Sequence, residues 1–237
     1  MVLDSRKKLE LEAKIQFLRR VPIFQALNED SLQRIAAIML EKAYSRKSIV
    51  FHEGDYGDTL YIIKMGRVKI AKVAIDGREK TLTILQPGDF FGEMAIFDNL
   101  PRSATAEAID QEVRLFGINK KDFERLIHEN PSISLRIMKD LTRRIRQINQ
   151  QVEDLAFKDV HGRVSSTLFQ LLETEEKIRG RDLSRLRMTH QDLANMVGSS
   201  RETVTRALNR LQSEGVITIS HQQIEILDRE YLEDKIF

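Results

Sequence analysis

Glycine is unevenly distributed in this chain, and that distribution limits the possible folds more than any other feature. Seven of the eleven glycines lie between positions 54 and 117. They separate short runs rich in β-branched and aromatic residues, at positions 49–51, 60–63, 68–73, 81–85 and 113–116. Asp76-Gly77, between two of these runs, is a strong hairpin signal. Short strands joined by turns predict an antiparallel sandwich or barrel, preceded by helices at about 5–19 and 30–41.

The pattern becomes helical after Pro131. Apolar residues then recur at spacings of three and four, which is the a/d seam of a coiled coil. The seam consists of Met138, Leu141, Ile145, Ile148, Val152 and Leu155. Its flanks are basic and polar, which favours an exposed seam that pairs two chains in a homodimer through residues 138–155. A helix buried against its own domain shows the same spacing, so that alternative stays open.

The seam stops near position 158, where Asp159 is suited to cap a helix at about 160–173. A charged stretch at 173–187 indicates a loop, and runs at 216–220 and 223–227 indicate a hairpin. We therefore predict an α+β protein in three parts. These are a β-rich domain with N-terminal helices at 1–130, a long helix at 131–157, and a C-terminal domain at 158–237.

Composition excludes several classes of protein. A length of 237 residues allows one large domain or two modest ones, and the formal net charge of +2 means that any basic surface must be local. The chain has no cysteine, which excludes disulfides, thiolate metal sites and a cysteine nucleophile and fits a reducing cytoplasm. A charged N-terminus and the lack of any apolar run near about 18 residues predict a soluble, cytoplasmic protein.

Residues 189–211 have the pattern of a helix-turn-helix. Thr189 and Asp192 suit the start of a first helix, Gly198 the turn, and Ser200 the start of a second helix. The inner face is apolar: Leu193, Ala194, Val197, Val204, Leu208 and Leu211. The outward face near the start of the second helix, where a recognition helix contacts bases, then carries Arg201, Glu202, Thr205 and Arg206. Arginine suits guanine and a carboxylate suits cytosine, so we expect a G·C-containing half-site.

Charge distribution separates this interpretation from that of an ordinary solvated helix. Residues 179–210 hold seven arginines and three acidic residues, a net charge of +4. The whole segment 158–237 holds twelve basic and thirteen acidic residues. Positive charge is thus concentrated on the predicted DNA-binding face, within a domain that is not basic overall.

A second motif, at residues 90–105, interrupts the strand pattern. Gly92 lets the backbone approach a ligand closely, and the turn after it resembles a short helix, whose N-terminal amides favour an anion. Arg102 and Ser103 offer a charged fork and a hydroxyl for phosphate oxygens. Glu93 suits a donor such as a sugar hydroxyl. A structural Glu93–Arg102 ion pair is the alternative.

At this point the sequence resembles a known family. The stretch at 54–66, the Phe-Gly-Glu…Pro-Arg-Ser-Ala-Thr motif at 90–105, and Ser-Arg-Glu-Thr-Val-Thr-Arg at 200–206 are similar to the Crp–Fnr family of bacterial transcription regulators. The resemblance covers residues 15–228 in consistent order and is greatest to the cyclic AMP receptor branch. It implies a cyclic-nucleotide-binding β-roll, a long dimerisation helix and a C-terminal winged helix-turn-helix.

The resemblance also implies the site residues. Cyclic AMP would lie against Gly92, Glu93, Met94, Arg102, Ser103, Ala104 and Asn149, with Glu93 on the ribose hydroxyl and Arg102 and Ser103 on the phosphate. Double-stranded DNA with TGTGA-like half-sites would be contacted by Thr189, Ser200, Arg201, Glu202, Thr205 and Arg206. RNA polymerase is an implied partner.

One departure from the family concerns the base of the nucleotide. Members that bind cyclic AMP present Thr-Ser or Thr-Asn to the adenine, whereas this chain has Ile148-Asn149. Control by another effector, or constitutive DNA binding, therefore stays open, as does a nucleotide-binding module that acts on a protein partner. The absence of cysteine sets aside the iron–sulfur and haem sensors. The five histidines are scattered, so we expect no metal site, and we find no motif of an enzyme.

Overall fold

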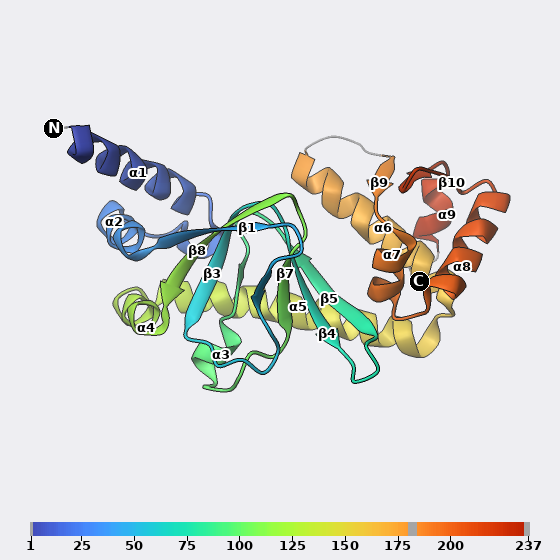
Figure 1. Ribbon diagram of the computed structural model, residues 1–237, viewed down its shortest axis with the longest axis horizontal. Coiled ribbons are helices and arrows are strands. Elements are labelled where there is room, and N and C mark those ends of the chain that lie inside the picture. Colours follow the sequence, from blue (N-terminus) through green and yellow to red (C-terminus); the bar gives the residue numbers. More distant parts are fainter. Residues whose placement is uncertain (1, 180–183, 235–237) are drawn as a thin grey trace. The chain divides into compact units, whose positions relative to one another are not determined.

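The computed structural model describes residues 2–179 and 184–234. The chain forms two compact units: the residues up to Lys72 together with Leu82–Ile145, and Val73–Thr81 together with the chain from Arg146 onward. The helices and strands are labelled in Figure 1. Within the described ranges, none of the helices combines the length and apolar character needed to cross a lipid bilayer.

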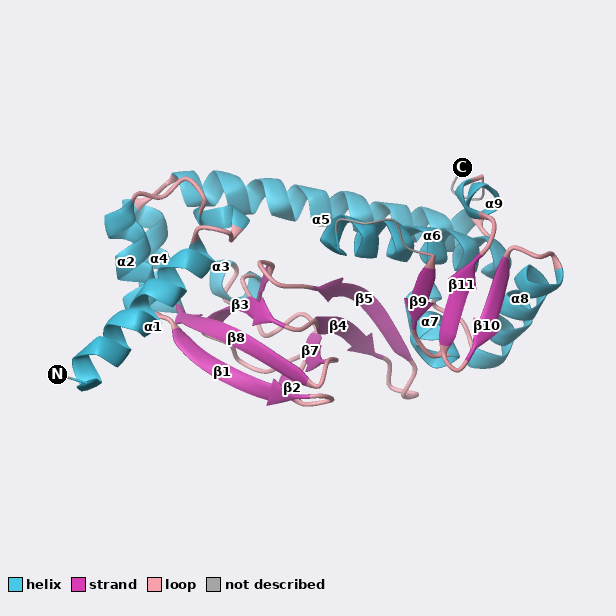
Figure 2. Cartoon of the chain, turned by 90° about the horizontal axis from the view of Figure 1, so that it is seen from above, coloured by secondary structure: helices cyan, strands magenta, loops and turns pink. Residues whose placement is uncertain are grey.

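The first unit contains the predicted antiparallel β-fold. Its strands form two four-stranded sheets with the orders β1-β8-β3-β6 and β2-β7-β4-β5 (Figure 2). Their bounds are β1 Leu40–Ser45, β2 Ile49–Phe51, β3 Thr59–Met65, β4 Val68–Val73, β5 Glu79–Leu85, β6 Phe90–Phe91, β7 Thr105–Ala108 and β8 Glu112–Asn119. All five predicted strand runs lie within these strands.

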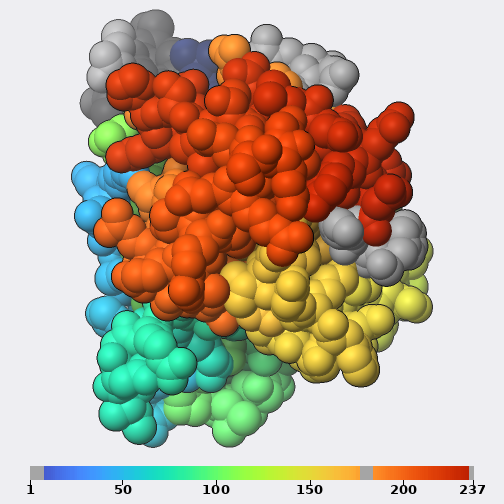
Figure 3. All heavy atoms as spheres, turned by 90° about the vertical axis from the view of Figure 1, so that its right-hand side faces the viewer, coloured from blue at the N-terminus to red at the C-terminus, as the bar shows by residue number. Residues whose placement is uncertain are grey.

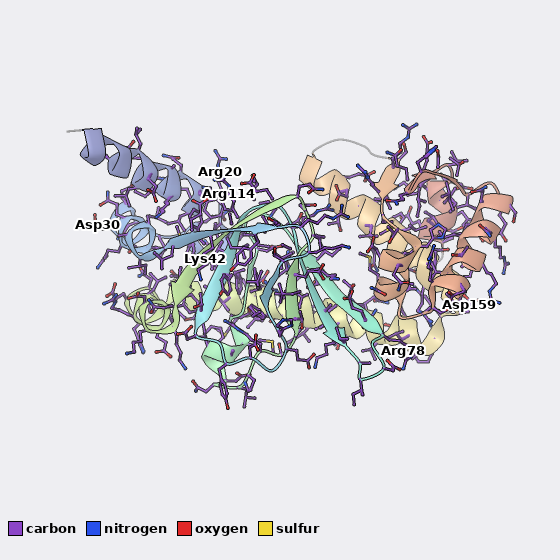
Figure 4. All side chains as sticks on the ribbon, in the orientation of Figure 1. Arg20, Asp30, Lys42, Arg78, Arg114 and Asp159 are labelled. Atoms are coloured by element: carbon purple, nitrogen blue, oxygen red, sulfur yellow. The ribbon has the colours of Figure 1, made fainter. Side chains whose placement is uncertain are left out.

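Turn chemistry and alternating burial explain these strands. Gly77 adopts a φ of +82°, and its amide bonds the carbonyl of Ala74, 2.9 Å away, so Asp76-Gly77 closes the predicted turn between β4 and β5. Figure 4 labels Arg78 beside this turn, where its side chain bonds Asp76. Inside the roll, Ile63, Val68 and other buried side chains form an apolar core. This roll supports the motif at residues 90–105.

Helices cover one end of the roll. They are α1 Val2–Leu18, the 3₁₀ turn Pro22–Phe24, α2 Glu29–Ile38 and α4 Lys120–Glu129. Asn28 caps α2 and Asn119 caps α4, each by accepting a backbone N–H three residues on. Phe24, Phe116 and Phe123 are fully buried where these helices meet the roll.

The structure corrects one predicted element of this unit and adds a helix that was not predicted. The helix predicted at 30–41 ends at Ile38, because Leu40–Ser45 pairs with β8 as strand β1. Helix α4 was not predicted from the sequence. The turn after Gly92 is helix α3, Met94–Phe97, and it is a single turn.

Helix α5, Ser132–Phe157, has two apolar faces. Ile133 and Ile137 are buried in the core of the first unit. The seam residues project elsewhere, and five of them are exposed: Met138 52%, Ile145 57%, Ile148 51%, Val152 59% and Leu155 44%. The alternative of an ordinary buried helix is therefore wrong for this chain by itself.

The second unit has the predicted helix-turn-helix with a β-hairpin. It comprises α6 Val160–Arg179, β9 Arg185–Arg187, α7 His190–Val197, α8 Arg201–Ser213, β10 Ile217–Ser220, β11 Gln223–Ile226 and α9 Arg229–Glu233. Strands β10, β11 and β9 form an antiparallel sheet in that order, visible beside α7 and α8 in Figure 2. Side chains from α6, α7, α8 and α9 fill one core.

Asp159, labelled in Figure 4, caps α6 as predicted, because its carboxylate accepts the Gly162 amide at 2.8 Å. The prediction that α6 ends near 173 is wrong, since the helix continues through Glu175 and Glu176 to Arg179. Residues 180–183 of the predicted loop lie outside the described residues. The division at 130 and 157 stays a prediction.

Candidate ligand pocket and nucleic-acid interface

Arg102 is the centre of the candidate pocket. The residue is 5% exposed, and its terminal nitrogens donate to the carbonyls of Gly92 at 2.7 Å and Thr59 at 2.8 Å. Its guanidinium lies 4.3 Å from the ring centroid of Phe51. Its Nε is buried and has no acceptor among the described residues. The side chain is thus held rigidly, with one donor left unsatisfied.

Two glycines make room for this side chain. A Cβ at Gly57 would lie 2.0 Å from the Arg102 Nε, and one at Gly92 would lie 2.5 Å from an Arg102 terminal nitrogen. Gly92 also has a φ of +82°, which L side chains rarely adopt. The arginine is therefore seated in a cradle that any larger residue at either position would fill.

The charge of Arg102 is poorly compensated. Its terminal nitrogens bond neutral carbonyl oxygens, and burial lowers its pKa from the ordinary value. A buried cation without a bonded counter-charge is costly, and an anion at the unsatisfied Nε would offset that cost.

Glu93 is also buried, at 4% exposed, but its partner is not Arg102. Its carboxylate lies 3.4 Å from an Arg144 terminal nitrogen, and Arg144 also donates to the Phe90 carbonyl at 2.6 Å. Burial raises the pKa of Glu93, and Arg144 opposes that shift. The alternative of a direct Glu93–Arg102 ion pair is wrong, because each side chain bonds other groups.

Arg144 was missed in the sequence, although a signal existed. Spacings of four, three and four place Arg144 on the same face of α5 as Ile133, Ile137 and Asp140. Ile133 and Ile137 are buried, so this face is directed at the roll. The Asp140 carboxylate forms an ion pair with Arg144, with Nε 2.7 Å from the nearer oxygen. The sequence signal was therefore a second helical face, distinct from the exposed seam, and this face carries an arginine towards the roll.

The other predicted ligand residues are placed as follows. Ser103 is exposed, and its hydroxyl contacts the Met94 sulfur at 3.4 Å, which puts these two side chains together at the motif. Ala104 is buried and begins the return towards β7. Asn149 is exposed on α5 in the second unit, so its role towards the ligand stays a prediction.

The residues present fit a phosphate group on two structural grounds. The buried Arg102 Nε requires an acceptor, and the cradle at Gly57 and Gly92 fixes the direction of its N–H. The nearby Ser103 hydroxyl and buried Glu93 carboxylate add a donor and an acceptor of the kinds that a sugar phosphate needs.

The helix-turn-helix is built as its sequence predicts. Thr189 and Asp192 form a reciprocal capping box, with each side chain accepting the other residue's backbone N–H at 3.0 Å. Gly198 ends α7 with a φ of +66°, and the Ser200 hydroxyl accepts the Thr203 amide at 3.2 Å at the start of α8. These features fix the turn between α7 and α8.

The predicted outward face is present with one change. Arg201, Glu202 and Arg206 are exposed, whereas Val204, Leu208 and Leu211 are buried. Hydrogen bonds from its own amide and from Ser200 lower the pKa of Glu202, which favours its charged form. Thr205 is half-buried and directs its hydroxyl to the Arg201 carbonyl, 2.8 Å away, so the outward placement is wrong for that hydroxyl.

The elements of the second unit form one continuous body in the space-filling view of Figure 3, where α7, α8 and the hairpin are orange to red. Among the described residues, no three His, Asp or Glu side chains come together where they could hold a metal ion. The surface chemistry of this unit is that of exposed arginines on a capped helix, as a nucleic-acid interface requires.

Comparison with known proteins identifies both domains. Residues 41–130 match the family described as "Cyclic nucleotide-binding domain", and residues 162–235 match the "Crp-like helix-turn-helix domain". The CRP-like cAMP-activated global transcriptional regulator of Mycobacterium tuberculosis is 38% identical over 221 residues, which is 92% of this chain and 97% of that protein. The cyclic AMP receptor protein of Thermus thermophilus is 30% identical over 91% of this chain and 97% of its own length.

Solved structures show the same fold. The c-di-GMP-responsive global regulator CLP of Xanthomonas campestris superposes with a TM-score of 0.75 at 27% identity, over 84% of this chain and 99% of that one. The Thermus thermophilus catabolite activator protein gives a TM-score of 0.52 at 30% identity, over 91% and 98%. With a cyclic-nucleotide-binding roll, a capped helix-turn-helix and relatives aligned over nearly its whole length, this chain belongs to the Crp–Fnr family of DNA-binding transcription regulators, near the cyclic AMP receptor branch.

Proposed function

We propose that this protein is a homodimeric regulator whose DNA binding is gated by a cyclic nucleotide, with cyclic AMP as the first candidate, and that it reads a palindrome of TGTGA-like half-sites. The observation that carries the proposal is Arg102, a buried cation with an unsatisfied Nε in a glycine cradle. A bound cyclic nucleotide would supply the missing negative charge and a sugar hydroxyl.

Each pocket residue has a separate task in this proposal. Arg102 donates through Nε to a phosphate oxygen, and Ser103 adds its hydroxyl. Glu93 accepts from the ribose, while Arg144 holds the Glu93 carboxylate in place from α5. Met94 and Ala104 flank the ligand, and Asn149 meets the base.

The exposed apolar seam of α5 supports the homodimer. Paired chains would bury Ile145, Ile148 and their neighbours and bring two recognition helices together. We propose that ligand binding extends this seam towards Leu155 and fixes the DNA-binding domains through Lys158 and Asp159. Moving an equilibrium from 1:99 to 99:1 needs about 5.5 kcal/mol. Two sites, each with one or two charge-assisted bonds of about 1.5–3 kcal/mol, supply that amount.

Calorimetry against cyclic AMP, cyclic GMP and cyclic di-GMP tests the pocket, with Arg102→Ala beside the wild type. We expect one nucleotide to bind and Arg102→Ala to lose about 10- to 100-fold in affinity, because the charge-assisted bond from Nε to the phosphate, worth about 1.5–3 kcal/mol, is removed. Arg114→Ala is the control, since Arg114 is an exposed arginine of the same unit that pairs with Glu112. Unchanged nucleotide affinity in Arg102→Ala would refute the pocket assignment.

A gel shift on a TGTGA…TCACA palindrome, with and without the nucleotide that binds, tests the gating. Equal DNA binding in both conditions would mean a constitutive regulator, and Ile148 is the reason to test for it. Binding of cyclic di-GMP alone would identify a different effector. Nucleotide binding without any DNA binding would favour a module that acts on a protein partner. In the proposed function the protein partner is RNA polymerase, the site of action is the cytoplasm, and the protein is not an enzyme.

A further inference from the structure

His190, the first residue of α7, joins the two helices of the helix-turn-helix. Its Nδ1 lies 2.9 Å from the Thr205 hydroxyl oxygen on α8. The ring is half-buried and lines a hollow of about 420 Å³ together with Arg201 from α8 and Ile219 and Gln222 from the hairpin. No motif in the sequence predicts a role for this histidine.

The hydrogen bonds around Thr205 determine which ring nitrogen carries the hydrogen. A hydroxyl has one hydrogen to donate, and that of Thr205 goes to the Arg201 carbonyl at 2.8 Å. The Thr205 oxygen therefore accepts from His190, which requires a hydrogen on Nδ1. In a neutral ring Nε2 then carries a lone pair, and it becomes a donor only when the ring takes up a second proton.

The charges around the ring favour an anion in the hollow. The neighbouring elements carry Arg187 at the end of β9, Asp192 on α7, and Arg201, Glu202 and Arg206 on α8. The Asp192 carboxylate is engaged by the Thr189 amide and hydroxyl in the capping box. The hairpin contributes uncharged side chains to the lining, Ile219 and Gln222 among them. Of the charged side chains, Arg201 shares the hollow with His190.

We propose that His190 is a positioning residue for the recognition helix and a proton-coupled contact to the DNA backbone. Its Nδ1–H holds Thr205 and so fixes α8 against α7. In a helix-turn-helix complex the first helix crosses the sugar-phosphate backbone, and backbone contacts set the register of the protein. A phosphate offers only acceptors, so Nε2 must be protonated to meet one. The inference deepens the DNA-binding role proposed above and rests on it.

The sign of the pH dependence follows from this proton. The DNA complex holds a proton on Nε2 that a neutral ring in the free protein lacks. DNA affinity must then fall as pH rises. The limit is about one proton, or about tenfold per pH unit, for each recognition helix.

The test compares full-length wild type with His190→Asn and His190→Ala by fluorescence anisotropy between pH 6 and 8.5 at fixed ionic strength. Two duplexes are used: the TGTGA…TCACA palindrome with saturating cyclic AMP, and a random-sequence duplex at low salt. Asparagine keeps a donor near the position of Nδ1 and cannot titrate. We expect His190→Asn to keep its discrimination between the palindrome and a one-base variant. Its DNA affinity should no longer show the wild-type pH dependence, which is at most about tenfold per pH unit for each recognition helix. His190→Ala should lose both the discrimination and the pH dependence.

His221→Gln is the matched control, because His221 lies in the turn between β10 and β11 of the same unit. It should leave the pH slope of the wild type unchanged. Equal slopes for wild type and His190→Asn on both duplexes would overturn the proton coupling. Unchanged discrimination in His190→Ala would overturn the positioning role. If the wild type does not bind the palindrome but binds random DNA with a pH-dependent affinity, the proposed half-site is refuted and the inference about His190 is retained.

Side-chain ¹H–¹⁵N NMR of the free protein tests the same inference without any assumption about DNA sequence or effector. The His190 signal, assigned by its loss in His190→Asn, should show the hydrogen on Nδ1 and become doubly protonated when random duplex is added. An Nε2–H tautomer in the free protein would contradict the hydrogen-bond assignment.

Discussion

The two candidate sites use arginine in opposite ways. Arg102 is 5% exposed, stacked on Phe51 and held by two carbonyls, whereas Arg201 and Arg206 are exposed on α8. A buried arginine has lost most of its hydration, so a single well-placed anion changes its free energy strongly. Exposed arginines keep their hydration and attract any phosphate backbone, with selectivity left to base geometry. A buried arginine therefore suits a site that responds to one bound ligand, and exposed arginines suit a surface that contacts DNA.

The largest expected effect comes from removing the space that the buried arginine occupies. In Gly57→Ala the new methyl group would lie 2.0 Å from the Arg102 Nε, so the guanidinium must leave its cradle. We expect nucleotide affinity, measured by calorimetry, to fall by about 10- to 100-fold, as when the charge-assisted bond itself is lost.

Gly162→Ala is the matched control for Gly57→Ala. A Cβ at Gly162 meets nothing closer than 3.4 Å, and its φ is not positive. It should leave nucleotide affinity unchanged. Wild-type affinity in Gly57→Ala would show that the seated position of Arg102 does not matter to the ligand.

An intermediate effect is expected at the exposed arginines. Arg201→Ala should cost about 1–3 kcal/mol of DNA binding and relax the preference for a guanine in the half-site, because the bidentate contact is lost. Arg210→Ala removes an arginine from the other end of α8, where it pairs with Glu214 at 2.8 Å, and should change little. Competition binding with single-base variants of the half-site measures both. An equal loss on every sequence would make Arg201 a backbone contact instead.

The smallest effect concerns stability and pH. Burial raises the pKa of Glu93. The contribution of this carboxyl to stability is therefore complete below the ordinary glutamate pKa of about 4.3 and is lost as pH rises through the raised value. The glutamine in Glu93→Gln cannot ionise. The melting temperature of this variant, relative to that of the wild type, should therefore rise by a few degrees between pH 4 and pH 8.

Differential scanning calorimetry at several pH values measures this gain. Glu124→Gln, which changes an exposed glutamate on α4, should track the wild type at every pH. A melting-temperature difference between Glu93→Gln and wild type that does not change with pH would mean that the carboxyl is stabilised equally in both charge states.

Local signals in the sequence predicted local structure well. The capping box at Thr189, the turn at Gly198 and the hairpin at Gly77 depend on a few adjacent residues, and all three are present. Strand β1 was missed because Leu40–Ser45 is mostly exposed and gains its conformation from pairing with β8, 67 or more positions further along the chain.

Long-range contacts explain what was missed at the sites. The residue types at the pocket were predicted, but their partners were not: Arg102 bonds Thr59, and Glu93 meets Arg144 fifty-one positions away. Thr205 was placed outward by helical spacing, and the His190 ring on another helix accounts for its actual direction. Such pairings depend on how elements pack, which periodicity within a single element does not specify.

Helix α5 carries Arg144 on one side and the apolar stripe with Met138 and Ile145 on another. Successive residues of an α-helix are 100° apart around its axis, and the helix is stiff over a few turns. If α5 rotates about its axis to improve the contact of this stripe with a second chain, the Arg144 guanidinium must also move relative to the Phe90 carbonyl and the Glu93 carboxylate. In the proposed homodimer, the pairing of the subunits and the position of the Glu93 carboxylate would therefore be coupled through α5.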